Sequence, residues 1–84
     1  MAKRIVWTTP AGADVRRIAQ QTAMRVLEGL ARYAAHDEGD VRRLTGIDPP
    51  ELRLRVGDYR VRLYNQGDWI EILRVLHRSQ AYCR

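Results

Sequence analysis

The feature that most restricts the fold is an alternation of apolar and charged residues around the dipeptide Gly57-Asp58. Leucine and valine alternate with arginine over residues 52–56, and the alternation resumes over residues 59–63. A period of two predicts strands with one buried face. A two-residue connection beginning with glycine is typical of a β-hairpin. The sequence therefore predicts antiparallel strands over Glu51–Val56 and Tyr59–Asn65, with Val56 opposite Tyr59.

This register sorts the side chains of the two strands by type. Counting outward from the turn puts apolar pairs on one face and arginine pairs on the other, as Leu54–Val61, Leu52–Leu63, Arg55–Arg60 and Arg53–Arg62. Like charges directly opposite each other destabilise a sheet. A rigid array of guanidinium groups suits a phosphodiester backbone, because affinity for nucleic acid comes largely from neutralised phosphates. We interpret Arg53, Arg55 and Arg62 as nucleic-acid-binding residues, and a solvated face is the alternative interpretation.

A third strand of this set is predicted over Trp69–His77. A four-residue loop before it places Tyr64 opposite Trp69 and Arg62 opposite Glu71, which offers Arg62 an ordinary ion pair. The same register puts His77 on the arginine face, as a fourth nucleic-acid-binding residue, and Arg78 on the other face. A β-bulge would reverse that assignment. Beyond the strand, a final helical turn would bring Arg78 and Tyr82, four residues apart, onto one side.

The N-terminal half predicts a strand followed by helix. Residues Arg4–Thr8 are mainly β-branched and aromatic, and Thr9-Pro10 has the residue types of a helix start. Apolar residues then recur at helical spacing to Ala34, which predicts a helical hairpin over Thr9–Ala35 with a break near Gln20-Gln21. The apolar side of the helices and the apolar face of the strands must each be buried against another element. We therefore expect an α+β fold with the helices on one face of an antiparallel sheet, as a single domain over residues 1–84.

Composition indicates the compartment and the kind of partner. The chain carries 15 basic residues, 14 of them arginine, against 10 acidic ones, a net charge of +5, so an anionic partner is expected. Cys83 is the only cysteine, which suits a reducing compartment. The apolar run near the N-terminus is too short for a signal sequence or a membrane span. The expected location is the cytoplasm, with no membrane partner.

Three segments resemble the RelE/ParE superfamily of bacterial toxin–antitoxin toxins. They are Val41-Arg42-Arg43-Leu44-Thr45-Gly46, the hairpin Leu52 to Tyr64, and Val75-Leu76-His77-Arg78 followed by Tyr82. The N-terminal strand and helices also fit, so the likeness covers nearly the whole chain. The RelE branch cleaves messenger RNA in the ribosomal A site, whereas the ParE branch inhibits DNA gyrase and lacks the cleavage residues. The pattern of His-Arg followed by tyrosine favours the RelE branch.

The resemblance implies a role for each of three residues. Arg60, after Gly-x-Tyr, corresponds to the arginine that stabilises the transition state. Arg78 corresponds to the leaving-group acid or charge stabiliser, and Tyr82 to the tyrosine that acts as base or stacks on a nucleobase. One departure concerns Arg53 and Arg55, which stand where relatives often have lysines that help activate the nucleophile. Arginine stays protonated, so it can steady charge but accepts a proton poorly.

The implied reaction is metal-independent attack by a ribose 2′-hydroxyl on the adjacent phosphodiester. Arginines supply the charge stabilisation, so neither a metal nor another cofactor is expected. Tyr82 can serve as base only if neighbouring arginines lower its pKa. His77 is the competing base, because its unperturbed pKa is near neutrality. The acidic stretch His36–Asp40 has metal-ligand residue types, but we interpret it as an exposed helix end.

The partners implied are a cognate antitoxin protein, in a toxin–antitoxin hetero-oligomer, and messenger RNA on the ribosome. An alternative is a non-catalytic gyrase inhibitor or nucleic-acid-binding protein that uses the same basic face. A third reading is a family member that keeps the fold and the partner but has lost activity, and the arginines at positions 53 and 55 keep this reading open. Convergence of Arg60, Arg78 and Tyr82 on one phosphate separates the first function from the others.

Overall fold

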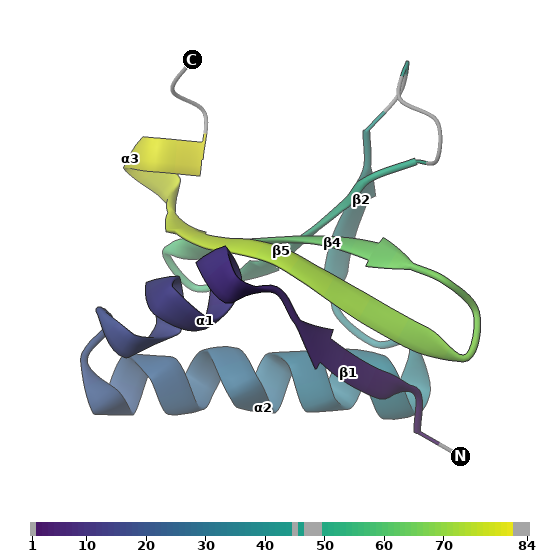
Figure 1. Ribbon diagram of the computed structural model, residues 1–84, viewed down its shortest axis with the longest axis horizontal. Coiled ribbons are helices and arrows are strands. Elements are labelled where there is room, and N and C mark those ends of the chain that lie inside the picture. Colours follow the sequence, from purple (N-terminus) through teal and green to yellow (C-terminus); the bar gives the residue numbers. More distant parts are fainter. Residues whose placement is uncertain (1, 45, 47–49, 82–84) are drawn as a thin grey trace.

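The computed structural model describes residues 2–44, 46 and 50–81 (Figure 1). A strand is followed by two helices, four more strands and a short helix. The bounds are β1 Arg4–Trp7, α1 Thr9–Arg16, α2 Gln20–His36, β2 Asp40–Arg43, β3 Leu52–Val56, β4 Tyr59–Asn65, β5 Trp69–His77 and α3 Arg78–Ala81. The α+β class, the helical hairpin and the four predicted strands are confirmed. The short strand β2 is an addition, since its four residues do not alternate in polarity.

The five strands form one sheet in the order β1-β5-β4-β3-β2. β1 runs parallel to β5, whereas every other neighbouring pair is antiparallel. The sheet is therefore mixed at one edge and antiparallel elsewhere. β2 forms the other edge, beside β3.

The β3–β4 hairpin has the predicted register. Leu54 lies opposite Val61, Val56 lies opposite Tyr59, and the two arginine pairs face each other. Gly57 in the turn has φ +58°, a conformation that glycine adopts without strain. The turn chemistry therefore determines which side chains share a face.

The predicted register between β4 and β5 is wrong. Tyr64 lies opposite Glu71 rather than Trp69, and Arg62 lies opposite Arg74 rather than Glu71. One cause is the connection, in which the Asn65 side chain accepts a hydrogen bond from the Gly67 N–H at 3.0 Å and closes a shorter loop. A second cause is a β-bulge: Leu63 lies opposite Ile72 and Arg62 opposite Arg74, so Leu73 is an extra residue.

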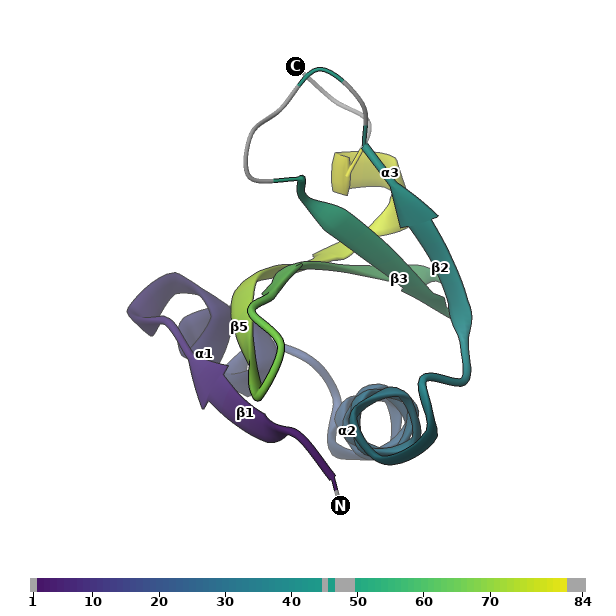
Figure 2. The same cartoon turned by 90° about the vertical axis from the view of Figure 1, so that its right-hand side faces the viewer.

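Helix α2 covers one face of the sheet, and the core lies between them (Figure 2). Seven large side chains are almost fully buried there: Val26, Leu30, Leu54, Val61, Leu63, Ile70 and Ile72. Gly29 permits the close approach, since a Cβ built on it would lie 2.8 Å from Cγ2 of Val56. The helix ends where Asp37 takes a left-handed conformation with φ 55°, near the predicted end of the hairpin.

Helix α1 continues along the edge of β5 where β1 ends. The Thr8 hydroxyl accepts a hydrogen bond from the Ala11 N–H at 3.3 Å and donates one to the Ile72 carbonyl at 2.8 Å, so it caps α1 and ties it to β5. The break between α1 and α2 falls at residues 17–19. Helix α3 lies on the side of the sheet away from α2 (Figures 1 and 2). No helix within the described residues is long and apolar enough to cross a membrane.

Candidate nucleic-acid interface

The face of the sheet opposite α2, called the outer face below, carries six arginines in two cross-strand rows. The row nearer the β3–β4 turn contains Arg55 and Arg60, which lie opposite each other. The second row runs across four strands, through Arg42, Arg53, Arg62 and Arg74. The sequence predicts the β3 and β4 members of both rows. It does not predict Arg42 and Arg74, because β2 and the β5 bulge bring them into register.

Arg62 is held by a buried carboxylate. Its Nε and Nη2 atoms donate hydrogen bonds to the two carboxylate oxygens of Glu51, at 2.8 and 2.9 Å. Glu51 is only 4% exposed. This hydrogen bonding raises the pKa of Arg62 above its ordinary value, although burial opposes the shift. Arg62 thus forms an ion pair, as the sequence predicts, but its partner is Glu51, just before β3, and not Glu71.

Arg74 has a similar partner in α1. Its Nε and Nη2 atoms donate to the Asp14 carboxylate at 2.7 and 3.0 Å, and the Val75 N–H donates to the same carboxylate at 2.9 Å. Burial alone would raise the pKa of Asp14, but these hydrogen bonds hold it below its ordinary value. The hydrogen bond from Asp14 raises the pKa of Arg74. The sequence gives no signal for this pair, because sixty positions separate the two residues.

Arg60 lies on the outer face but is 7% exposed. Its Nη1 atom donates to the Gly57 carbonyl at 2.9 Å and to the Tyr59 carbonyl at 3.1 Å. The guanidinium group is therefore fixed at the β3–β4 turn. By contrast, Arg55 is exposed and Arg53 is half-buried.

Arg78 begins α3 and is attached to the same turn. Its N–H donates to the Asp58 carbonyl at 2.7 Å, and its Nε atom lies 3.9 Å from the Asp58 carboxylate. Both side chains of that ion pair are largely exposed. The fold thus brings Arg60 and Arg78 to one end of the sheet. The predicted helical turn after β5 is confirmed over residues 78–81, whereas Tyr82 lies outside the described residues.

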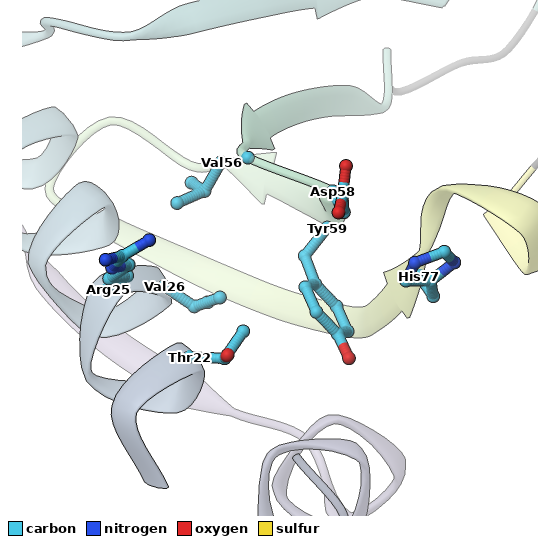
Figure 3. A pocket seen from close by; sticks show the side chains of 8 residues that line it. Thr22, Arg25, Val26, Val56, Asp58, Tyr59 and His77 are labelled. Carbon is cyan, nitrogen blue, oxygen red and sulfur yellow. The ribbon is translucent and has the colours of Figure 1, made fainter. Parts of the chain in front are cut away.

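His77 does not share a face with the arginines, so that expectation is wrong. The bulge at Leu73 shifts the alternation, and His77 lies opposite Tyr59, on the side of α2. The two rings meet edge to face, with centroids 5.4 Å apart. Together they line one end of a cavity of about 350 Å³ between the β3–β4 turn and α2 (Figure 3). The His77 Nδ1 atom accepts a hydrogen bond from the Ser79 N–H at 3.2 Å.

Several solved structures share this fold, among them three toxin–antitoxin complexes. The RelE–RelB complex from Pyrococcus horikoshii OT3 matches with TM-score 0.76 and 25% identity, over 95% of this chain and 99% of that one. The RelB–RelE complex from Methanococcus jannaschii matches with TM-score 0.75 and 22% identity, over 92% of this chain and 94% of that one. The RelBE2 complex from Mycobacterium tuberculosis matches with TM-score 0.68 and 24% identity, over 93% of this chain and 100% of that one.

Sequence comparison identifies the family. No curated protein sequence matches the chain significantly. The family model for the ParE toxin of the type II toxin–antitoxin system parDE matches residues 5–82, nearly the whole chain. The fold neighbours are toxin–antitoxin complexes of the RelE type, and the superfamily expected from the hairpin and the C-terminal residues is therefore confirmed. The chain belongs to the ParE toxin family within the RelE/ParE superfamily of toxin–antitoxin toxins.

Proposed function

We propose that this toxin cleaves messenger RNA on the ribosome, without a metal ion. The observation that carries the proposal is that Arg60 and Arg78 are both attached to the β3–β4 turn, at one end of the arginine-rich outer face. Two cationic groups near one turn, one of them held by two backbone carbonyls, are suited to a phosphate that gains charge during reaction, because groups already in place need little reorganisation. Arg53 and Arg55 would contact the RNA backbone nearby.

The proposed reaction is an internal transfer at phosphorus. The ribose 2′-oxygen bonds to the adjacent phosphorus while the bond from phosphorus to the 5′-oxygen breaks. A base takes the 2′-hydroxyl proton and the leaving 5′-oxygen gains one, which leaves a 2′,3′-cyclic phosphate and a 5′-hydroxyl. In this scheme Arg60 steadies the phosphorane-like state, Arg78 steadies the leaving oxygen, and Tyr82 is the base.

Two observations favour Tyr82 over His77 as the base. His77 lies on the α2 side of the sheet, away from the outer face. Its Nδ1 atom is also engaged within the chain, because it accepts the Ser79 N–H at 3.2 Å and lies 2.9 Å from the Ser79 Oγ atom.

We also propose that the toxin acts in the cytoplasm and is bound there by a cognate antitoxin in a hetero-oligomer. Two solved structures that share its fold, from Methanococcus jannaschii and Pyrococcus horikoshii OT3, are complexes of RelE with RelB. The net charge of +5 would favour an acidic antitoxin segment. A non-catalytic inhibitor of DNA gyrase is the second candidate function, and the match to a ParE family model favours it.

A paired assay separates the two functions. The purified toxin is added to ribosomes programmed with a defined messenger RNA, and separately to DNA gyrase acting on a plasmid. The proposal expects new RNA ends with 2′,3′-cyclic phosphate termini and unchanged supercoiling, with Arg78→Ala as the inactive control. Blocked supercoiling with intact messenger RNA would establish the second candidate instead.

A further inference from the structure

The longer arginine row is continuous from one side of the outer face to the other. Strand β2 pairs Arg42 with Arg53, and the row then passes through Arg62 to Arg74. Neighbouring strands lie about 4.8 Å apart, so four positions span about 14 Å, at right angles to the strands. An extended polyanion lying along this row would meet one guanidinium group on each strand it crosses.

The arginines of the two rows differ in whether a carboxylate neutralises their charge. In the longer row, Arg62 on β4 and Arg74 on β5 are each bound through two nitrogens to a buried carboxylate. Arg42 and Arg55, on β2 and β3, are exposed. Within the described part of the chain neither forms an ion pair. Asp40 lies opposite Arg55 in the strand pairing, but it is exposed and makes no ion pair with it.

This difference between the arginines determines where on the outer face a phosphate binds most favourably. A guanidinium group bound through two nitrogens to a buried carboxylate has its charge neutralised, and a phosphate there would be repelled by that carboxylate. An exposed arginine without a carboxylate neutralises a phosphate directly and releases a counterion from the nucleic acid. Away from the β3–β4 turn, the phosphate-binding charge of the outer face therefore lies toward the β2 edge rather than over β4 and β5.

We infer that single-stranded RNA runs from the β3–β4 turn across β3 to the β2 edge, with Arg55 and Arg42 as phosphate contacts. In this arrangement Arg62 and Arg74 stabilise the fold and do not contact the RNA. Arg62 therefore differs from the nucleic-acid-binding role that the sequence predicts for it. The inference rests on the proposed function, because it places the RNA that Arg60 and Arg78 would act upon. It adds a contact on β2, the strand that the sequence pattern does not predict.

Binding can be measured apart from cleavage. The probe is a fluorescent single-stranded RNA, 2′-O-methylated throughout so that no 2′-hydroxyl can attack, and the affinity of the toxin is measured by anisotropy at several salt concentrations. Each lost contact with single-stranded RNA lowers the slope of log affinity against log salt by about 0.7. Arg42→Gln with Arg55→Gln should therefore lower the slope by about 1.4 and weaken binding about tenfold or more at 100 mM salt.

The matched control removes two charges from the other side of the molecule. Arg25→Gln with Arg32→Gln on α2 changes the net charge equally and should leave the slope unchanged, since both residues are exposed on the helix. Equal slopes for the two double variants, with wild-type binding intact, would overturn the inference but not the proposed cleavage. Loss of antitoxin binding alone in the Arg42/Arg55 variant would also overturn it. A reduced slope in a toxin that cuts no ribosomal messenger RNA would uphold the inference and reject the cleavage.

Discussion

The carboxylate of Asp14 joins helix α1 to strand β5 by accepting two hydrogen bonds from Arg74 and one from the Val75 N–H. Asp14 is 7% exposed, so Asp14→Ala leaves the Val75 N–H buried without its acceptor. We expect the free energy of unfolding to fall by about 2 to 4 kcal/mol, measured by urea denaturation. Glu28→Ala, which removes an exposed carboxylate from α2, should change it by less than about 0.5 kcal/mol. Equal losses in both variants would contradict the assignment.

The same carboxylate predicts how stability depends on pH. The pKa of Asp14 is lower in the folded state than its ordinary value of 3.8, so folding favours the charged form. Its contribution is therefore fully present above about pH 4 and declines as the pH falls through the folded-state pKa. The stability difference between wild type and Asp14→Asn should be constant from pH 7 to pH 5 and shrink below pH 4. A difference that grows on acidification would contradict the direction of the shift.

Substitution by alanine should change the free energy of unfolding in opposite directions at Gly29 and Gly12. In a helix, alanine is favoured over glycine by about 1 kcal/mol. At Gly29 this gain is outweighed, because the new Cβ would lie 2.8 Å from Cγ2 of Val56 in the packed layer between α2 and β3. Gly29→Ala should lower the free energy of unfolding by about 1 to 2 kcal/mol. Gly12→Ala meets only the Arg16 side chain at 3.5 Å and should raise it, as thermal denaturation of the two variants would show.

Arg78 offers a cleaner test of cleavage than Arg60. The Arg78 side chain is 64% exposed, so Arg78→Ala should fold normally and lower single-turnover cleavage of ribosomal messenger RNA about a hundredfold. Arg60→Ala should lower cleavage similarly, but Arg60 also binds two carbonyls of the turn, so its variant needs a check of thermal stability. Wild-type cleavage by folded Arg78→Ala would reject the role given to that residue.

Association with the antitoxin should depend on salt in a particular way. The net charge of +5 and the exposed arginines attract an acidic partner over a distance, and salt screens that attraction. Raising sodium chloride from 50 to 500 mM should slow association about tenfold or more while changing dissociation only slightly, in stopped-flow measurements with the cognate antitoxin. A larger effect on dissociation would indicate that buried ion pairs hold the complex together.

The sequence predicts best the parts of the fold that depend on local chemistry. The Gly57-Asp58 turn sets the β3–β4 register, so the pairing of Arg55 with Arg60 follows from adjacent residues. The bulge at Leu73 has no local signal, and this one residue changes the face on which His77 lies. The partners Glu51 and Asp14 are also missed, because each depends on packing between distant segments. Roles that depend on exposure, such as that of Arg62, are therefore visible only in three dimensions.

The pairing of the first strand with the last has a consequence for synthesis of the chain. β1 contacts β5 in parallel, so residues 4–7 must wait for residues 69–72 before their backbone groups can pair. A nascent chain that ends before β5 lacks the strand that joins β1 to the rest of the sheet and also Arg78. Closing so long a loop is costly in entropy and comes late in folding. A chain that has not yet reached residues 69–72 therefore cannot complete the sheet, so the folded toxin forms only once its C-terminal strand is available.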